Sequence, residues 1–573
     1  DALTRMNFIM LTQHDVLDPE IELSIRIKSD KENNLLTIED VGVGMTEEEI
    51  ITNLGTIAHS GINAFIEATK ENNAKLSDLI GQFGVGFYSA FMVADSITVE
   101  SRSYQVDSTG VRWTSKGVES YTVEPIEKNE RGTKVILHLF PEASEFLDIN
   151  HLKSVIHKHS DFIPYPIYLG DETEPTNQRN ALWRKSPREV TQQEYEDFYR
   201  QYTLDLEKPL NQIHLSIDAP VQLYALLFIP SSSEKPIFSP RKQDGLKLYA
   251  RKILIQEYTT DLLPEYLRFV QGIVDSEDIP LNVSRETIQS YKIISQLKKI
   301  ITGKIIDSLS EMAKNQPEVY EKFWNNFGMF LKEGIAIDPD YHTSIPSLLR
   351  FKTLKNQETL TSMDEYIAQK KEDQMSIYYI LGTDEVSTRQ SPHLDYYKHH
   401  GFDVILMTDP VDSFFLIKLD KYKDIKLTNV ATEVPPMENK LEEEKDSENT
   451  DENEALRNRF KEFLGDRVSD IRISNRLYES PARLVDANTD ITPELQRVYQ
   501  LLKKDYPSPE KILEINSNHP IIQKLALINE QDPRNPIIIQ QIYENALLVE
   551  GLHPNPASMI GRIQDIINAA LEK

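Results

Sequence analysis

The sequence predicts a multidomain α+β protein with an N-terminal α/β sandwich, an α/β middle domain and a mostly helical C-terminal dimerisation domain. The chain has 573 residues, more than one hydrophobic core can organise, which implies about three or four domains. Strand-like and helix-like stretches are grouped in its first part without a βαβ unit, which is typical of an α+β sandwich and not of a doubly wound sheet. Its last part carries two strongly apolar helical stretches.

The first domain is predicted to span residues 1–170. Residues 21–27 alternate between apolar and polar side chains and predict a half-buried strand, which pairs with residues 35–39 in a hairpin. Thr46, followed by three glutamates, has the composition of a capped helix start. Further strands are predicted at residues 96–101, 121–124 and 134–139.

A polar, proline-containing stretch at residues 171–182 predicts a linker, and a middle domain is expected at residues 183–435. In its second half, residues 376–381, a helical stretch and residues 403–407 form a plausible βαβ unit. The other elements expected in this domain are strands at 212–217 and 222–229, joined by a turn at Ala219-Pro220, and helices at 288–312 and 319–331.

Residues 436–453 are rich in acidic, Asn and Ser residues and predict a solvated linker before a C-terminal domain at residues 454–573. Two helices close the chain, one at residues 536–550 and one that opens at Asn555-Pro556 and carries apolar residues at heptad-like spacing. So apolar a hairpin needs a partner, either its own domain or a second copy in a four-helix bundle. We favour self-association.

The composition excludes several classes of function. A formal net charge of −28 argues against nucleic acid as the main partner, because a polyanion would be repelled. The chain has no cysteine, which excludes disulfides and thiol catalysis and fits a reducing compartment. No apolar run reaches the roughly 18 residues that a membrane span needs. The sequence opens at Asp1 without Met, so we expect it to be a fragment.

Two glycine-rich motifs in the first domain indicate a nucleotide pocket. The segment Gly81-Gln-Phe-Gly-Val-Gly-Phe-Tyr88 places three glycines within six residues, and its exposed N–H groups suit a phosphate chain. Upstream, Asp40-Val-Gly-Val-Gly supplies a single carboxylate whose direction is fixed by a tight glycine turn. Residues 53–61, between the two motifs, are rich in small side chains and are expected to form a movable lid.

These motifs resemble the ATP-binding domain of the heat shock protein 90 chaperones, which is of the GHKL type. The resemblance rests on Asp40-Val-Gly-Val-Gly-Met45, residues 53–58 and 80–90, and Arg131-Gly-Thr-Lys134. It continues beyond that domain in Asn180-Ala-Leu-Trp183 and in Val274-Asp-Ser-Glu-Asp-Ile-Pro-Leu-Asn-Val-Ser-Arg-Glu-Thr-Ile-Gln289, which is similar to the family's catalytic loop. The short linker points to the bacterial branch of the family.

The resemblance implies a role for individual residues. Asp40 would accept a hydrogen bond from the adenine amino group, with Thr133 beneath the adenine and Asn53 toward the sugar and phosphates. Arg285 would reach the γ-phosphate after domain closure, with Gln289 nearby, and these two are the expected catalytic residues. A salt bridge at the surface or between domains is the alternative role for Arg285. The full set of expected nucleotide-binding residues is Ala2, Asp40, Gly44, Met45, Asn53, Gly84, Val85, Gly86, Phe87, Thr133 and Arg285.

The resemblance also implies ATP and Mg²⁺ as cofactors. The family's general-base glutamate and magnesium-ligating asparagine would precede Asp1, so we assign no metal ligand and expect little or no hydrolysis by this chain. The family's first strand and helix would also precede it.

The predicted function is that of an ATP-dependent chaperone and ATPase that binds and remodels client proteins as a cytoplasmic homodimer, without nucleic-acid or membrane partners. Two alternatives remain open at this stage. One is a DNA mismatch-repair or gyrase-type ATPase of the same superfamily, which the net charge and residues 274–289 disfavour. The other is a client-binding scaffold without turnover.

Overall fold

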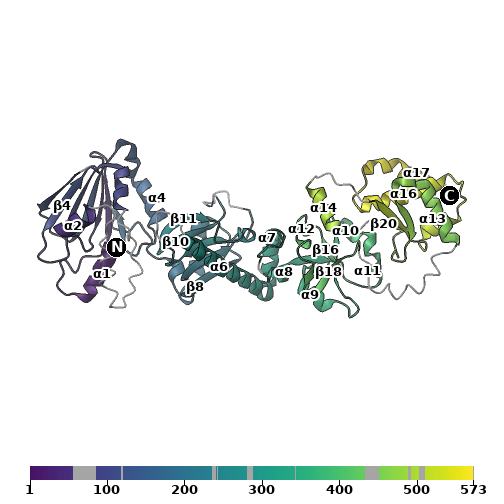
Figure 1. Ribbon diagram of the computed structural model, residues 1–573, viewed down its shortest axis with the longest axis horizontal. Coiled ribbons are helices and arrows are strands. Elements are labelled where there is room, and N and C mark those ends of the chain that lie inside the picture. Colours follow the sequence, from purple (N-terminus) through teal and green to yellow (C-terminus); the bar gives the residue numbers. More distant parts are fainter. Residues whose placement is uncertain are drawn as a thin grey trace. The chain divides into compact units, whose positions relative to one another are not determined.

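The structure is a computed structural model that describes residues 1–55, 86–117, 120–234, 241, 243–279, 288–341, 343–432, 451–487, 492–502 and 510–571. The chain forms two compact units. Figure 1 labels their helices and strands. The first comprises Asp1–Leu263 and Arg268–Ile301, and the second comprises Pro264–Leu267 and Thr302–Lys573.

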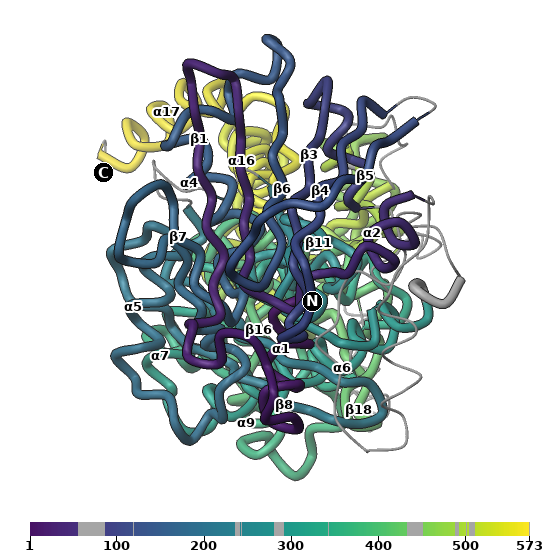
Figure 2. Tube along the Cα trace, turned by 90° about the vertical axis from the view of Figure 1, so that its left-hand side faces the viewer, coloured from purple at the N-terminus to yellow at the C-terminus, as the bar shows by residue number. Residues whose placement is uncertain are grey.

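A seven-stranded sheet forms the N-terminal part of the first unit, in the order β5-β4-β3-β6-β2-β1-β7 (Figure 2). All neighbouring strands are antiparallel except β1 and β7, which are parallel. This topology confirms the predicted α+β class. The strands are β1 (Ile25–Asp30), β2 (Leu35–Asp40), β3 (Ala94–Arg102), β4 (Gly110–Ser115), β5 (Tyr121–Ile126), β6 (Gly132–Leu139) and β7 (Ile167–Leu169).

Helices pack against this sheet and complete its apolar core, to which Ile50, Trp113 and Ile156 contribute. The predicted capped helix is present, because the Thr46 hydroxyl accepts from the Glu49 N–H while the Glu49 carboxylate accepts from the Thr46 N–H. The helices of this part are α1 (Ala2–Thr12), α2 (Glu47–Leu54), η2 (Phe87–Met92), η3 (Pro141–Leu147) and α4 (Ile149–His159).

The first unit also contains a five-stranded sheet in the order β11-β10-β12-β9-β8. Fully buried Trp183 lies in its core, with its ring 4.4 Å from that of Phe162 and 5.2 Å from that of Tyr249, centroid to centroid. The elements are α5 (Gln192–Thr203), β8 (Asn211–Ile217), β9 (Leu223–Ile229), β10 (Leu246–Ala250), β11 (Ile253–Thr259) and β12 (Gln271–Asp275).

The second unit opens with α6 (Ile288–Asn315), which begins in the first unit, and α7 (Pro317–Ile337). A six-stranded sheet follows, in the order β14-β13-β16-β15-β18-β17. Strands β15 and β16 pair in parallel, which confirms the predicted βαβ unit. The elements are α8 (Ile345–Leu348), β13 (Arg350–Thr353), β14 (Thr361–Ser362), α9 (Met363–Gln369), β15 (Ile377–Leu381), α10 (Glu385–Arg389), α11 (Asp395–His399), β16 (Ile405–Met407), α12 (Asp412–Leu416), β17 (Lys421–Tyr422) and β18 (Ile425–Asn429).

The C-terminal part is mainly helical, but it also contains a three-stranded sheet, β19-β21-β20, that the sequence analysis did not predict. The two predicted closing helices are present as α16 and α17. Most of the predicted acidic linker, residues 436–450, lies outside the described residues, and residue 451 already belongs to α13. The elements are α13 (Asp451–Leu464), β19 (Asp470–Ile473), β20 (Ala482–Asp486), α14 (Pro493–Leu501), β21 (Lys511–Ile515), α15 (Pro520–Leu527), α16 (Arg534–Val549) and α17 (Met559–Leu571).

The first sheet differs from expectation in its first strand and in two strands that were not predicted. Its first strand begins at Ile25, four residues after the predicted start at residue 21, where the Ile25 N–H donates to Pro166 O and pairing with β7 begins. Strands β4 and β7 were not predicted. None of the described helices is long and apolar enough to cross a membrane.

Candidate nucleotide-binding site

The sheet register places three polar residues in one row across β2, β6 and β3. Asp40 is opposite Thr133 in the β2–β6 pair, and Thr133 is opposite Ser101 in the β6–β3 pair. The side chains of directly opposed residues lie on the same face of a sheet. The register therefore brings together Asp40 and Thr133, two of the predicted site residues.

Ser101 connects this row to the turn that follows β2. Its hydroxyl oxygen lies 2.9 Å from the Thr133 hydroxyl oxygen and accepts from the Met45 N–H at 2.9 Å. Ser101 is fully buried, so these bonds take the place of water. Ser101 was not among the predicted site residues, because a serine within a strand gives no local signal.

Asp40 retains an acceptor for a ligand. Its Oδ1 accepts from the Gly42 N–H at 2.8 Å, whereas its Oδ2 has no hydrogen bond within the described residues. Burial raises the pKa of the Asp40 carboxyl, against the opposing effect of the Gly42 N–H. A partly buried carboxylate with an open acceptor fits a ligand that brings a hydrogen-bond donor.

The turn after Asp40 lies so close to the neighbouring strands that only glycine fits. Gly44 has φ +60°, and a Cβ there would lie 1.7 Å from Arg102 O. The N-terminal helix also lies against this turn, because the Val43 N–H donates to Ala2 O at 3.3 Å and a Cβ on Gly42 would lie 2.7 Å from the Ala2 Cβ. Ala2, Asp40, Gly44 and Met45 are thus brought together.

The remaining predicted residues are placed in part. Asn53 Nδ2 lies 3.9 Å from Met45 Sδ. Gly86 precedes η2, and the Phe87 ring packs edge-on against Trp113 in the core, with ring centroids 5.7 Å apart. The Tyr88 hydroxyl donates to Leu54 O at 3.0 Å and so joins η2 to the end of α2.

Four of the predicted residues cannot be related to this row. Gly84, Val85 and Arg285 lie outside the described residues, as does most of the expected lid at residues 53–61. Gln289 lies in the first turn of α6, but its side chain is not described. Within the described part of the chain, no group of three or more His, Asp or Glu side chains could hold a metal ion.

The described residues fit adenine. Asp40 offers an acceptor for an exocyclic amino group, the Thr133 hydroxyl lies beside it, and Met45 supplies an apolar side chain at the same turn. Adenine presents both a donor edge and an apolar face, so this combination of groups matches it better than it matches a phosphate or a metal ion.

Comparison with known proteins assigns the chain to a protein family. The family described as "Hsp90 protein" matches residues 170–573, and the family described as "Histidine kinase-, DNA gyrase B-, and HSP90-like ATPase" matches residues 20–137. The chain belongs to the Hsp90 family. The second match contains Asp40, Ser101 and Thr133, so the polar row lies within the segment that resembles the ATPase domain.

Similar Hsp90 proteins cover this chain from end to end. It is 40% identical to the chaperone protein HtpG of Desulfitobacterium hafniense over 584 aligned positions, which span 100% of this chain and 93% of that protein. It is 39% identical to HtpG of Chlorobium phaeobacteroides (100% and 92% covered) and of Halorhodospira halophila (99% and 93%). The Hsp90 match over residues 170–573 gives no support to the DNA-repair alternative.

Proposed function

We propose that this chain is an ATP-dependent molecular chaperone of the HtpG type, which uses nucleotide binding to remodel client proteins. The observation that carries the proposal is the open Oδ2 of partly buried Asp40, within the segment that matches Hsp90-like ATPases. Similarity to HtpG chaperones over the whole chain supports the chaperone role. A cytoplasmic location belongs to the same proposal.

In this proposal each residue of the site has a defined task. Asp40 accepts from the adenine amino group, and Ser101 holds the Met45 N–H and the Thr133 hydroxyl so that the site is formed before the ligand arrives. Gly44 lets the turn approach β3. ATP, bound with Mg²⁺, supplies the phosphoanhydride bond. Gly84, Val85, Gly86 and Phe87 are proposed to hold the phosphates, and Arg285 and Gln289 to act at the γ-phosphate.

The C-terminal helices are proposed to form a homodimer. On α17 the side chains of Ile560, Ile563, Ile567 and Leu571 are 56%, 39%, 51% and 77% exposed, although apolar side chains at this spacing ordinarily face a partner. Burial of this stripe against a second copy would cover it. We also propose domain boundaries after residues 170, 182, 435 and 453.

The proposed function is tested with a heat-denatured model protein and the complete gene product. ATP should change the ability of the wild-type protein to suppress aggregation, and Asp40→Asn should remove that dependence, because the amide presents a donor where the adenine needs an acceptor. Calorimetry with ATP on the same samples shows whether the variant has lost ATP binding. Unchanged ATP affinity in Asp40→Asn would show that the site is wrongly assigned.

A further inference from the structure

Arg131 directly precedes β6 and is buried although it carries a charge. It belongs to the motif Arg131-Gly-Thr-Lys134, of which the nucleotide row uses only Thr133, and it is 1% exposed. Its Nη1 donates to Asp18 O at 2.6 Å and to Leu17 O at 3.3 Å, and its backbone N–H donates to an Asp18 carboxylate oxygen at 3.2 Å. Arg131 thus holds the segment at Leu17 and Asp18 through both its side chain and its backbone.

Two backbone hydrogen bonds connect Leu17 to the turn that follows Asp40. The Leu17 N–H donates to Tyr104 O, and the Tyr104 N–H donates to Val43 O, each at 2.8 Å. Val43 lies in that turn, and its side chain is buried in one small apolar cluster with Val16. A displacement of this segment would therefore reach the turn through both hydrogen bonds and packing.

The sheet connects the same turn back to Arg131. Thr133, two residues after Arg131, is opposite Asp40 in the β2–β6 pair. Gly132 lies between them at φ +108°, where a Cβ would lie 2.1 Å from Asp40 O, so the start of β6 is pressed against the beginning of the turn. Arg131 thus closes a ring of contacts around the turn, with its backbone on the β6 side and its side chain on the other.

The Arg131 guanidinium is poorly satisfied for a buried cation. A guanidinium carries five N–H donors, but Nε and Nη2 of Arg131 have no hydrogen-bond partner in the described part of the chain, and the side chain forms no ion pair there. Burial lowers the pKa of Arg131, and the charge of Asp18 opposes that shift. Stability alone therefore does not account for an arginine at this position, since an apolar side chain would avoid the cost.

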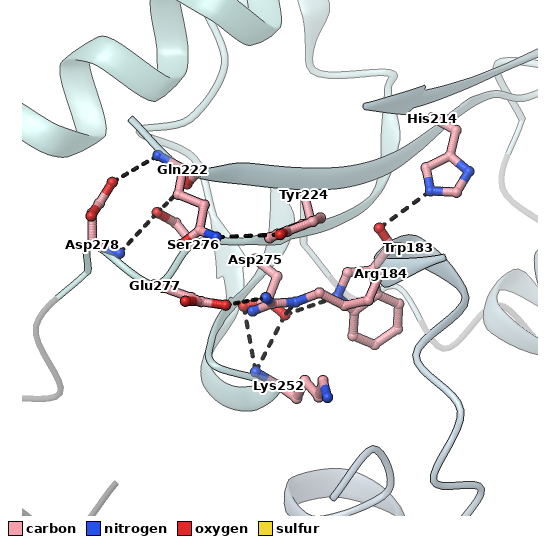
Figure 3. Close-up of polar contacts among 10 residues, drawn as sticks. All are labelled: Trp183, Arg184, His214, Gln222, Tyr224, Lys252, Asp275, Ser276, Glu277 and Asp278. Carbon is pink, nitrogen blue, oxygen red and sulfur yellow. Dashed lines mark hydrogen bonds and ion pairs between the residues drawn. The ribbon is translucent and has the colours of Figure 1, made fainter. Parts of the chain in front are cut away.

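Arg184, in the other sheet-containing part of the first unit, shows a shielded arginine whose charge is paired. Its Nε donates to Asp275 Oδ2 at 2.7 Å and its Nη1 to a Glu277 carboxylate oxygen at 2.5 Å (Figure 3). Asp275 is fully buried and also accepts from Trp183 Nε1 at 2.9 Å. Two carboxylates thus explain why Arg184 is shielded from water, whereas the Arg131 side chain has only backbone carbonyls as acceptors.

We propose that Arg131 is a positioning residue for adenine recognition, which holds the turn after Asp40 so that the open carboxylate oxygen stays available to the adenine amino group. The proposal rests on the proposed function, because it assigns Asp40 to that amino group. Arg131 acts through the backbone of the turn and not by contact with the nucleotide. Its loss should therefore weaken ATP binding and leave the hydrolytic step unchanged.

The test compares Arg131→Met with wild type in the complete gene product, at a temperature where circular dichroism shows both folded. Calorimetry gives the ATP affinity, and steady-state hydrolysis gives kcat and KM. We expect ATP affinity to fall by roughly tenfold, because a hydrogen bond to an ionised group contributes at least that factor. The KM should rise with it, whereas kcat at saturating ATP should stay within about twofold of wild type.

Two variants separate positioning from general damage. Arg131→Lys should recover most of the affinity, because one nitrogen, Nη1, makes both side-chain bonds and a single ammonium group can replace it. Arg26→Met is the matched control, because Arg26 Nη1 also donates to a backbone carbonyl, Gly170 O at 2.9 Å. Arg26 is opposite Glu39, so it lies on the other face of the sheet from Asp40, and its loss should leave ATP affinity unchanged.

Asp18→Gly decides the question if Arg131→Met fails to fold. It removes the carboxylate that accepts from the Arg131 N–H, while glycine adopts the left-handed backbone of Asp18, φ +54°, without strain. The side-chain bonds of Arg131 to the backbone remain possible in this variant. ATP affinity should therefore fall less than in Arg131→Met, by about two- to fivefold.

The outcomes are distinct. Wild-type ATP affinity in folded Arg131→Met, or in Asp18→Gly if the former does not fold, overturns the role of Arg131 and leaves the proposed function standing. So does a loss in Arg26→Met as large as in Arg131→Met, or a failure of Arg131→Lys to recover affinity. Absence of ATP binding by the wild-type protein overturns the proposed function and the role of Arg131 together, and calorimetry identifies that case before any variant is made.

Discussion

The first unit contains two inward-facing aspartates with opposite arrangements of partners. Asp40 accepts one hydrogen bond, from Gly42 two residues away, and its second oxygen is open within the described residues. Asp275 accepts from Trp183, Arg184 and Lys252, which come from distant segments, and its carboxylate is saturated. An open acceptor is available to a ligand, whereas a saturated one fixes the positions of its donors. The difference assigns binding to Asp40 and positioning to Asp275.

Asp275→Ala should have the largest effect on folding. The substitution leaves the Arg184 cation and the Trp183 N–H without their buried acceptor, which should lower the free energy of unfolding by about 3–5 kcal/mol. Chemical denaturation measures this loss. Asp197→Ala is the matched control, because Asp197 forms a half-exposed pair with Arg200 at 3.7 Å and should cost below about 1 kcal/mol. Equal losses in the two variants would contradict the role of Asp275.

Gly44→Ala should have the next largest effect, on the Asp40 side of the comparison. The new Cβ would meet Arg102 O at 1.7 Å in a turn held at φ +60°, so we expect a loss of roughly 2–4 kcal/mol in the free energy of unfolding, together with weaker ATP binding. Gly170→Ala separates the two causes, because Gly170 has φ +62° but nothing within 4 Å of a Cβ. A loss in Gly170→Ala as large as in Gly44→Ala would show that the close approach is unimportant.

Ser101→Ala should have a moderate effect on both stability and binding. It leaves the Met45 N–H without its acceptor, at a cost of about 1–3 kcal/mol in the free energy of unfolding, and it frees the Thr133 hydroxyl. ATP affinity should fall with it. Thr98→Ala removes a similar hydroxyl pair, with Thr114 at 3.3 Å on the same sheet, and should leave ATP affinity unchanged. Calorimetry measures the ATP affinity of both variants. Equal losses of ATP affinity in the two would contradict the assignment of Ser101 to the site.

Acidification should give the smallest effect, a gradual loss of ATP affinity. Ionised Asp40 is the acceptor, and protonation converts that oxygen into a donor. Since burial raises the pKa of Asp40, affinity should be full above that pKa and should begin to fall at a higher pH than for an ordinary aspartate, which titrates near 3.8. Calorimetric titrations across a pH series measure this. If the ATP affinity stayed constant down to the pH range in which an ordinary aspartate titrates, the result would contradict a raised pKa of Asp40.

Local signals accounted for much of the fold. The capped helix at Thr46 follows from neighbouring residues, and the parallel pair β15–β16 follows from two apolar strands with helical residues between them. The seven-stranded sheet was harder to predict, because β1 starts where β7 pairs with it, from residues more than a hundred positions later. β4 and the C-terminal sheet were missed for a similar reason, since short strands depend on their partners.

The residues of the two sites also fall into those that a local sequence motif could predict and those that it could not. Asp40 and the glycines around it form a contiguous motif, so they could be named from the sequence, whereas Ser101 joins them only through the register of β3 and β6. The donors to Asp275 come from residues 183, 184 and 252, and no spacing in the sequence connects them. Side-chain contacts between segments distant in the sequence were therefore the part of the two sites that could not be predicted.

The central claim is that Asp40 binds the nucleotide and Asp275 holds the fold. It is tested most directly by measuring both ATP binding and stability for a variant of each residue. ATP affinity by calorimetry and the melting temperature are measured for Asp40→Asn and for Asp275→Asn in the complete gene product. We expect Asp40→Asn to lose ATP binding and to keep the wild-type melting temperature, and Asp275→Asn to keep ATP binding and to melt at a lower temperature. If Asp40→Asn binds ATP as the wild type does, or if Asp275→Asn loses binding while its melting temperature is unchanged, the two assignments are wrong.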